Sequence, residues 1–526
     1  MSSGTFRLAR RTTATAALLW IVSTAQPVVG AGLPEQATEM NRLPRIRPDY
    51  TQLVIPPNIA PLNFQIEEPG REFRVRLHGP AGKEILLNSH HASVVIPPKP
   101  WRELLQQNLG TNILVEISVK GTNGQWARFE PIENTVAREK IDSHLVYRLI
   151  GPVCTWFRNM GIYQRNLENF DEKPVLLNSA IGNGCVNCHS FQNNSPDLFS
   201  FHVRPGTRDK NAAKVAAGMV LVRGGKATWL QTKSEAAPRP PGYLSWNPTA
   251  PVVAFSMSKP GQLFRAVGAE GRDVFDSISD LAVMNVDTCA AAATPGIAAP
   301  DRLETFPGWS ADGKFLYFSS AQTLWNPNDP PTPELIAKTK FDLMRVAYNA
   351  ADGSWGKPET LLTAAETGKS ILEPRASPDG RYLLFCMTDY GGFPIHQAGC
   401  DLYLLDLKSG QHRRLECNSD AADSWHCWSS NSRWFVFSSK RDNGLLARPY
   451  FCYLDANGRE HKPFVLPQED PAFYDTWLKT YNVPELITGP ITATPAELAR
   501  AALSGKEAGQ PAQPGGGSQK DGSAMP

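Results

Sequence analysis

The second half of the chain repeats one hydrophobic pattern, in which a polar turn is followed by four apolar or aromatic residues. The turn is rich in Ser, Pro, Asp, Asn and Gly, and the run after it has the length of a buried β-strand. This unit occurs four times, at residues 246–256, 309–319, 376–385 and 428–438. The copies begin roughly 50 to 70 residues apart, which is typical of β-propeller blades with enlarged loops. A long β-sandwich is the alternative, but a recurrence this regular favours the propeller.

Each copy continues with a loop, a second apolar strand, a polar turn and a last strand. Residues 145–177 and 198–231 follow the same order of strands and predict two further blades. The pattern therefore predicts six blades over residues 139–470.

The first part of the chain predicts a different β domain. Short alternating runs cover residues 73–77, 84–87, 92–96 and 113–120, and a Gly-Thr-Asn-Gly turn follows them. We interpret residues 32–138 as a small β-sandwich-like domain, so that the fold class is all-β. Residues 48–64 contain three prolines that a central strand excludes, and we expect an extended segment laid over a surface.

The two ends of the chain predict other features. Residues 1–31 combine a basic start, a short apolar core and small residues, which is the pattern of a cleaved secretory signal peptide. An uncleaved anchor helix is the alternative, but the apolar core is short for it. Residues 471–504 predict a C-terminal extension with short helices at 475–480 and after Thr494. Residues 505–526 are rich in Gly, Pro and Ser and predict a disordered tail.

Composition narrows the range of functions. The 53 Lys and Arg nearly balance the 51 Asp and Glu, for a net charge of +2. This balance argues against nucleic acid as a partner. After the signal peptide no long apolar run remains, and we expect no transmembrane segment once the signal is cleaved. The 44 Pro and 41 Gly fit a turn-rich β protein.

One motif carries chemistry. Cys185-Val186-Asn187-Cys188-His189 is the attachment pattern of a c-type haem. Two thiols at this spacing bind the vinyl groups of one haem, and His189 then supplies the proximal ligand of the iron. A redox Cys-x-x-Cys and half of a zinc site are the alternatives. Because haem c is attached outside the cytoplasm, the signal peptide and the motif support each other, and we expect a periplasmic or otherwise exported protein with one haem c.

The blade pattern places the motif on the innermost strand of the second blade or in the loop before it. Three histidines are expected on the same face and are candidates for a sixth ligand: His202, His396 and His426. We favour His202 because it belongs to the haem blade. Met219, Met257 and Met387 are weaker candidates, since methionine in strands more often packs in the core. An open sixth position is a further alternative.

Nine cysteines less the haem pair leave seven, an odd number, so at least one thiol is free or pairs with another chain. Five of them crowd one region and allow a disulfide of undetermined connectivity: Cys386, Cys400, Cys417, Cys427 and Cys452.

The motifs together resemble a family of exported bacterial proteins that join one c-type haem motif to a TolB-like β-propeller. The resemblance rests on PDYTQLVIPPNIAPLNF, GCVNCHSFQNNSPDLFSFHVR, SPDGRYLLFCMTDYGGFPIHQAGCDLYLLDL and DSWHCWSSNSRWFVFSSKRDNG. It implies haem at Cys185, Cys188 and His189 and implies no particular reaction.

Three functions follow as hypotheses. The first is electron transfer by a mono-haem cytochrome whose propeller docks a redox partner protein. The second is a haem-dependent oxidoreductase acting on a small molecule, although no second cofactor motif is present. The third is a binding or sensing module with a structural haem. Asp389, Asp401, Asp423 and Arg375 suggest a polar pocket, but we assign them no catalytic role. The oligomeric state is left open.

Overall fold

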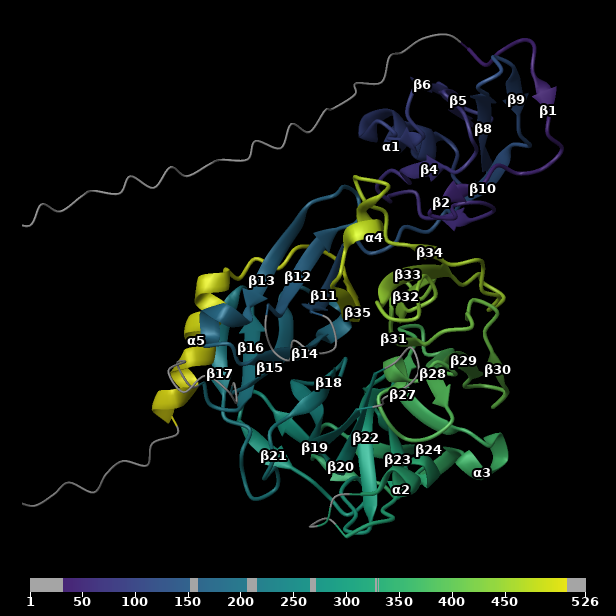
Figure 1. Ribbon diagram of the computed structural model, residues 1–526. Coiled ribbons are helices and arrows are strands. Elements are labelled where there is room, and N and C mark those ends of the chain that lie inside the picture. The colour runs from purple at the N-terminus through teal and green to yellow at the C-terminus, as the bar shows by residue number, and fades with distance from the viewer. Residues whose placement is uncertain are drawn as a thin grey trace, which may run out of the picture.

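The computed structural model describes residues 32–151, 159–205, 215–264, 271–326, 329 and 331–508. The predicted signal peptide, Cys154 and residues 509–526 lie outside this part of the chain. The described residues form an N-terminal β domain and, beside it, a ring of six β-sheets (Figure 1). The expected all-β fold with a propeller is confirmed.

The N-terminal domain holds two sheets and one helix. The larger sheet has seven strands: β1 (Thr38–Glu39), β3 (Val54–Ile55), β5 (Glu72–His78), β6 (Ile85–Ser89), β8 (Asn112–Lys120), β9 (Trp126–Arg128) and β10 (Ile132–Val136). The smaller sheet has three: β2 (Ile46–Arg47), β4 (Phe64–Ile66) and β7 (Ser93–Val94). Helix α1 (Pro98–Gln107) starts on a proline and buries Trp101, Leu104 and Leu105. Strand β5 alternates buried and half-buried residues, as the sequence pattern predicted.

The proline-punctuated segment 48–64 lies between the two domains, where most of its side chains are buried. Its Tyr50 hydroxyl donates to the Val465 carbonyl at 3.4 Å, and the Ala60 amide donates to the Leu167 carbonyl at 2.7 Å. The segment does run over the propeller, as expected, but the N-terminal sheets cover it from the other side. It thereby joins the domains.

The ring consists of six blades, each built around four antiparallel strands. Blade 1 contains, from the axis outward, β35 (Thr480–Ile487), β11 (His144–Ile150), β12 (Gly161–Asn166) and β13 (Glu172–Leu177). Blade 2 contains β14 (Cys185–Phe191), β15 (Leu198–Arg204), β16 (Gly218–Arg223) and β17 (Lys226–Leu230). Blade 3 contains β18 (Gly242–Trp246), β19 (Val252–Phe264), β20 (Arg272–Asn285) and β21 (Ala290–Ala292).

Blades 4 to 6 complete the ring. Blade 4 contains β22 (Arg302–Trp309), β23 (Phe315–Gln322) and β24 (Asp342–Asn349), and both β25 (Ser354–Trp355) and β26 (Glu359–Leu362) pair with β24. Blade 5 contains β27 (Ser370–Ala376), β28 (Tyr382–Thr388), β29 (Asp401–Asp406) and β30 (His412–Arg414). Blade 6 contains β31 (Asp423–Trp428), β32 (Trp434–Ser439), β33 (Arg448–Tyr453) and β34 (Phe464–Val465). Short helices α2 (Pro333–Lys338) and α3 (Ala364–Thr367) lie in loops of blade 4 and before blade 5.

The repeated polar turn has a local cause. In blade 4 the Ser310 hydroxyl donates to the Asp312 carboxylate at 2.7 Å, and the Gly313 amide donates to the Ser310 carbonyl at 2.9 Å. Gly313 has a φ of 70°, in the left-handed region that glycine adopts without a steric penalty. The same turn joins the innermost strand to the second strand in blades 5 and 6.

The ring is closed by the far end of the chain, which the sequence analysis did not foresee. Strand β35 pairs with β11 and becomes the innermost strand of blade 1. The propeller therefore extends beyond residue 470, to Ile487. The helix expected at 475–480 is the shorter α4 (Phe473–Thr476), because the chain turns into β35 at Thr480.

The expected helix after Thr494 is present as α5 (Pro495–Ala508). Thr494 and Glu497 form a reciprocal capping box at its start. Its buried residues, among them Leu498 and Ala502, pack with Val222 and other residues of blade 2. The helix continues through residues 505–508, where the sequence predicted the tail to begin.

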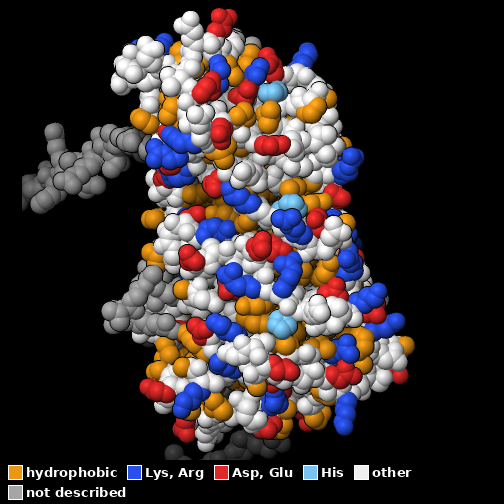
Figure 2. All heavy atoms as spheres, turned by 90° about the vertical axis from the view of Figure 1, so that its right-hand side faces the viewer, with side chains coloured by type: hydrophobic (Ala, Val, Ile, Leu, Met, Phe, Trp, Pro, Cys, Tyr) orange, Lys and Arg blue, Asp and Glu red, His pale blue; other side chains and the backbone are white. Residues whose placement is uncertain are grey.

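None of the helices within the described ranges combines the length and the apolar character of a membrane span. On the face seen in Figure 2, acidic and basic side chains are interspersed along both domains.

Candidate functional site

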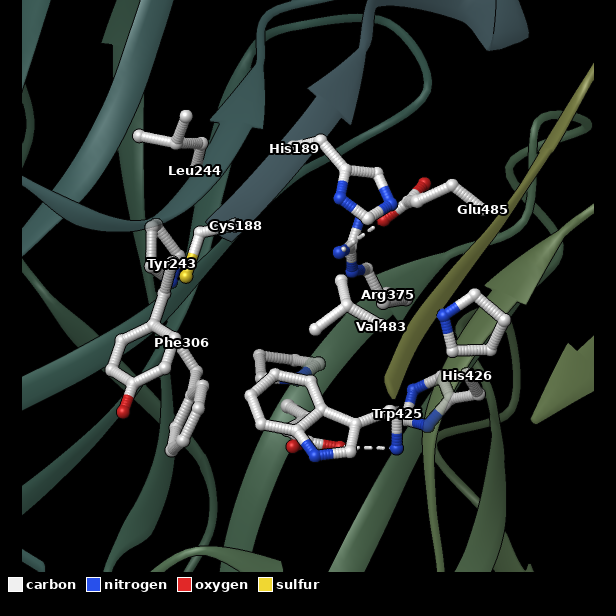
Figure 3. A pocket seen from close by; sticks show the side chains of 14 residues that line it. Cys188, His189, Tyr243, Leu244, Phe306, Arg375, Trp425, His426, Val483 and Glu485 are labelled. Carbon is white, nitrogen blue, oxygen red and sulfur yellow. Dashed lines mark hydrogen bonds and ion pairs between the residues drawn. The ribbon is translucent and has the colours of Figure 1, made fainter. Parts of the chain in front are cut away.

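The innermost strand of every blade contains a β-bulge at the same place. One residue in each strand has a φ between 46° and 58°, and the pairing with the second strand shifts there. These residues are Cys188, Tyr243, Phe306, Glu373, Trp425 and Val483. Such a backbone is costly for residues other than glycine, so the packing of the ring must hold it. The bulges turn six side chains toward the axis, and Figure 3 shows five of them around one central space.

This central space is a cavity of about 30 Å³, large enough for one water molecule. The residues after the bulges also line it, including His189, Arg375, His426 and Glu485. Arg375 and Glu485 form an ion pair at 2.8 Å across the channel. A second cavity, of about 330 Å³, lies beyond this pair and is lined by the polar turns of the blades.

On the other side of the ring lies a cavity of about 410 Å³ that both motif cysteines line. Cys185 and Cys188 stand on β14, the innermost strand of blade 2, where the blade pattern placed them. Neither is in a disulfide. Tyr243 and Trp425 line this cavity and the central one, so the two adjoin at Cys188.

The motif thiols are buried in a basic environment. Burial raises the pKa of Cys185, and it raises the pKa of Cys188 to about 11. The guanidinium groups of Arg148 and Arg204 oppose this shift at both sulfurs. Arg204 is the direct strand partner of Cys185. At neutral pH the two groups are therefore thiols.

His189 is 1% exposed, and neither of its ring nitrogens makes a hydrogen bond to a described residue. Burial lowers its pKa to about 3, while the nearby carbonyl groups of Val146 and Val483 act in the opposite direction. The ring is thus neutral, which is the form that binds a metal. It lines the central cavity beside Arg375 and Glu485, next to the larger cavity that the cysteines line (Figure 3). A buried imidazole that lacks well-formed hydrogen bonds is costly unless something else binds it.

The three candidate histidines separate. His202, on β15, pairs in register with Asn187 of the motif and lines the 410 Å³ cavity. It is 3% exposed, its Nδ1 lacks a partner among the described residues, and burial lowers its pKa well below the usual range. His396 lines the same cavity from the loop of blade 5, where its ring stacks on Phe393 at 6.3 Å.

His426 does not line this cavity, contrary to the expectation that all three histidines reach one face. Its Nε2 lies 2.9 Å from the Leu384 carbonyl and its Nδ1 lies 3.8 Å from the Cys386 sulfur. It belongs to the wall of the central channel. Met219, Met257 and Met387 are buried in apolar clusters between strands, as core packing predicts, and line none of the cavities described above.

Sequence reasoning missed two arginines and an aspartate of the large cavity. Arg148 stands on β11, and its guanidinium donates to the Asn482 side chain of β35 at 2.8 Å. Among the described residues, neither Arg148 nor Arg204 is within ion-pair distance of a carboxylate. Asp276 lies in the cavity wall, and burial raises its pKa to about 7. In the sequence, the one sign of these cavity residues was Arg148, a charged residue within the otherwise apolar run of β11.

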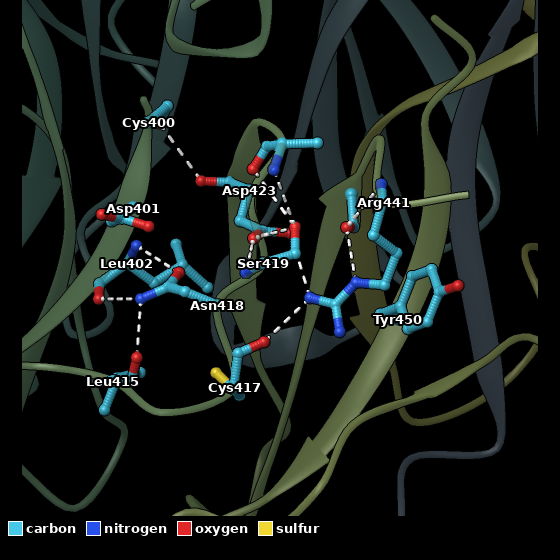
Figure 4. Close-up of polar contacts among 12 residues, drawn as sticks. Cys400, Asp401, Leu402, Leu415, Cys417, Asn418, Ser419, Asp423, Arg441 and Tyr450 are labelled. Carbon is cyan, nitrogen blue, oxygen red and sulfur yellow. Dashed lines mark hydrogen bonds and ion pairs between the residues drawn. The ribbon is translucent and has the colours of Figure 1, made fainter. Parts of the chain in front are cut away.

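The four residues that suggested a polar pocket are dispersed. Asp389 pairs with Lys369, Asp401 with Arg414, and Arg375 with Glu485. Asp423 accepts from Ser419 and Arg441 in a buried network that Figure 4 shows. The five cysteines of this region are buried thiols, and those of Cys417 and Cys452 contact each other, as do those of Cys386 and Cys400.

No family model and no curated protein matches the chain. Among solved structures, it is similar to TolB from Acinetobacter baumannii, with 13% identity and a TM-score of 0.40, over 71% of this chain and 79% of that one. It is also similar to the Dos1 propeller, with 13% identity and a TM-score of 0.33, over 55% and 63% of the two chains. An oligogalacturonate lyase from Vibrio parahaemolyticus has 11% identity and a TM-score of 0.34, over 66% and 88%. These similarities say nothing of activity.

Proposed function

We propose that this protein is an exported mono-haem c-type cytochrome. Cys185 and Cys188 would hold one haem c covalently, and His189 would be the proximal ligand of its iron. The propeller would dock a redox partner protein. The observation that supports this function is that both motif cysteines line one cavity while the adjoining His189 is buried and neutral, with neither ring nitrogen in a well-formed hydrogen bond to a described residue.

The residues present fit such a group. A cavity of about 410 Å³ is within the usual range for cofactor sites, and Ile150, Met160 and Phe393 give it an apolar wall. Arg148 and Arg204 add positive charge near the cysteines. When bound, the haem supplies one-electron redox chemistry, and the surrounding residues tune its potential. Burial of His189 keeps water and protons from the imidazole.

His202 is the proposed sixth ligand. It lines the same cavity as both cysteines, and its Nδ1 has no described partner. His396 is the alternative, from the opposite blade. His189 and His202 together would hold the iron from the protein side, and the haem would then supply electron transfer at a potential that these ligands and their burial tune. Export through the N-terminal signal, and hence a periplasmic site, is part of the same proposal because haem c is attached outside the cytoplasm.

The test compares optical spectra of the exported wild type, His202→Ala and His396→Ala, oxidised and reduced. We expect covalently bound haem in all three, a low-spin spectrum in the wild type and in His396→Ala, and a high-spin spectrum in His202→Ala. Absence of covalent haem from the wild type contradicts the function. A high-spin wild type that binds carbon monoxide when reduced instead favours small-molecule chemistry at the iron, or sensing, over electron transfer.

A further inference from the structure

Three buried side chains of different types converge on the wall of the central channel, between blades 5 and 6. They are Glu373 on β27, Cys386 on β28 and His426 on β31. The Cys386 sulfur lies 3.4 Å from Glu373 Oε2 and 3.8 Å from His426 Nδ1. One ligand atom from each residue lies within 4.8 Å of the other two. None of these residues belongs to the cysteine motif.

Two buried acceptor atoms of this cluster, His426 Nδ1 and Glu373 Oε1, have no donor other than the Cys386 thiol among the described residues. Because the Leu384 carbonyl can only accept, His426 Nε2 carries the ring proton at 2.9 Å from it, and the lone pair of Nδ1 faces Cys386. The Cys386 sulfur also lies 3.9 Å from the Asp423 carbonyl. The Trp425 amide donates to Glu373 Oε2 at 2.8 Å, and the Cys400 thiol donates to the Asp423 carbonyl at 3.2 Å. Of the three acceptors around the Cys386 sulfur, His426 Nδ1 is therefore the one that depends on the Cys386 proton. Glu373 Oε1 has no hydrogen-bond partner among the described residues. The unpartnered Glu373 Oε1 and the lone pair of His426 Nδ1, buried on either side of a thiol, favour a cation.

The spacing is that of a tetrahedral site. Ligand atoms that bind Zn²⁺ at about 2.0–2.3 Å lie about 3.3–3.6 Å from one another, close to the separations around Cys386. The bond from His426 Nε2 to a backbone carbonyl is the outer contact that usually orients a metal-binding histidine. Glu373 and His426 also line the central cavity of about 30 Å³, which leaves room for a water molecule as the fourth ligand.

We propose that Glu373, Cys386 and His426 bind a divalent first-row cation of the Zn²⁺ class, which links blade 5 to blade 6 at the channel wall. Thiolate, imidazole and carboxylate together suit Zn²⁺ better than Mg²⁺ or Ca²⁺. Binding releases the thiol proton of Cys386 to solvent. The cation site does not depend on the haem, so a failure of one proposal leaves the other unaffected.

Cys400 provides the competing explanation. Its sulfur donates to the Asp423 carbonyl at 3.2 Å and contacts the Cys386 thiol. In an oxidising compartment these two thiols can form a disulfide, which would remove Cys386 from the cation site. A cation bound at Cys386 and a Cys386–Cys400 disulfide exclude each other, and the experiment below distinguishes between them.

The experiment uses the full-length exported protein, purified without chelators and incubated with zinc chloride. X-ray absorption at the zinc edge of the wild type is expected to show one sulfur neighbour at about 2.3 Å together with nitrogen or oxygen neighbours. Zinc titration is expected to give one ion per chain in the wild type and in the control Cys400→Ser. We expect affinity to fall at least about tenfold in Cys386→Ser and His426→Gln.

Several results would overturn the site. They are a zinc spectrum without sulfur, equal affinity in all four proteins, or peptide mapping that finds Cys386 bridged to Cys400 in the exported protein. The absorption spectrum needs only the wild type, so a variant that fails to fold does not remove the test.

Discussion

Glu304 is a carboxyl group buried without adequate compensation. It stands on β22, is 1% exposed, and its Oε2 has no hydrogen-bond partner among the described residues. Its Oε1 accepts a long bond, of 3.5 Å, from the Ser320 hydroxyl, and the Ala299 backbone opposes the effect of burial on its pKa only in part. Burial raises its pKa to about 8, and the neighbouring Asp280 adds to the shift. Up to this pH the folded protein holds a proton that an unfolded chain has lost.

The contribution of Glu304 to the stability of the protein should therefore fall between about pH 4.5 and pH 8. The contribution of Glu304 is fully present below the pKa of the unfolded group and is lost as the pH rises through the folded pKa. The slope is on the order of 1 kcal/mol per pH unit. Urea denaturation at pH 5 and at pH 8 measures the free energy of unfolding. Between these two pH values, Glu304→Gln should lose less of this free energy than the wild type does. Glu359→Gln, at an exposed position of the same blade, is the control. If Glu304→Gln loses as much free energy of unfolding between the two pH values as the wild type, the assignment to Glu304 is contradicted.

Among the strands, β35 matters most for the closure of the propeller, because it completes blade 1 and thereby closes the ring. It contacts the innermost strands of blades 6 and 2 on either side and pairs with β11. Seven of its eight residues are buried. A strand from the end of the chain thus completes the first blade, so the propeller cannot close until nearly the whole chain is present.

Truncating this strand's core should loosen the closure. Leu486 is fully buried, and Leu486→Ala should lower the free energy of unfolding by about 2–5 kcal/mol. Leu478, which precedes the strand and is 65% exposed, is the matched control, and Leu478→Ala should change stability by less than about 0.5 kcal/mol. Urea denaturation measures both, and equal effects would show that β35 does not secure the ring.

At the scale of the whole molecule, two buried thiols link blades 5 and 6. Cys417 follows β30 and Cys452 stands on β33. Burial and contact with the Cys452 thiol raise the pKa of Cys417 well above its usual range. If the protein is exported as proposed, it matures where thiols in contact are oxidised to disulfides.

We therefore predict a Cys417–Cys452 disulfide in the exported protein. A loop of about 35 residues closed in this way adds roughly 4 kcal/mol to stability. Peptide mapping without reductant should find the bridge in exported protein and two thiols in protein made in the cytoplasm without residues 1–31. Two thiols in the exported protein would contradict the prediction. The same map reports whether Cys386 is bridged.

Local patterns were enough for much of the fold. Repeated turns predicted the blades, because a Ser-x-Asp-Gly turn forms from contacts within five residues. The capping pair of Thr494 and Glu497 predicted the start of α5 for the same reason. The order of strands alone placed Cys185 and Cys188 on the innermost strand of blade 2 or in the loop before it, and the structure places them on that strand.

The sequence by itself determined the fold class, and it predicted six blades and the blade that carries the cysteine motif, because periodicity and turn chemistry are local. Only the tertiary structure decided which distant groups meet. It joined Arg148 of β11 to Asn482 of β35, placed His202 and not His426 in the wall of the cavity that both motif cysteines line, and set a bulge in every innermost strand. These outcomes depend on packing around a closed ring, and no pattern within one strand encodes the neighbour that the ring will supply.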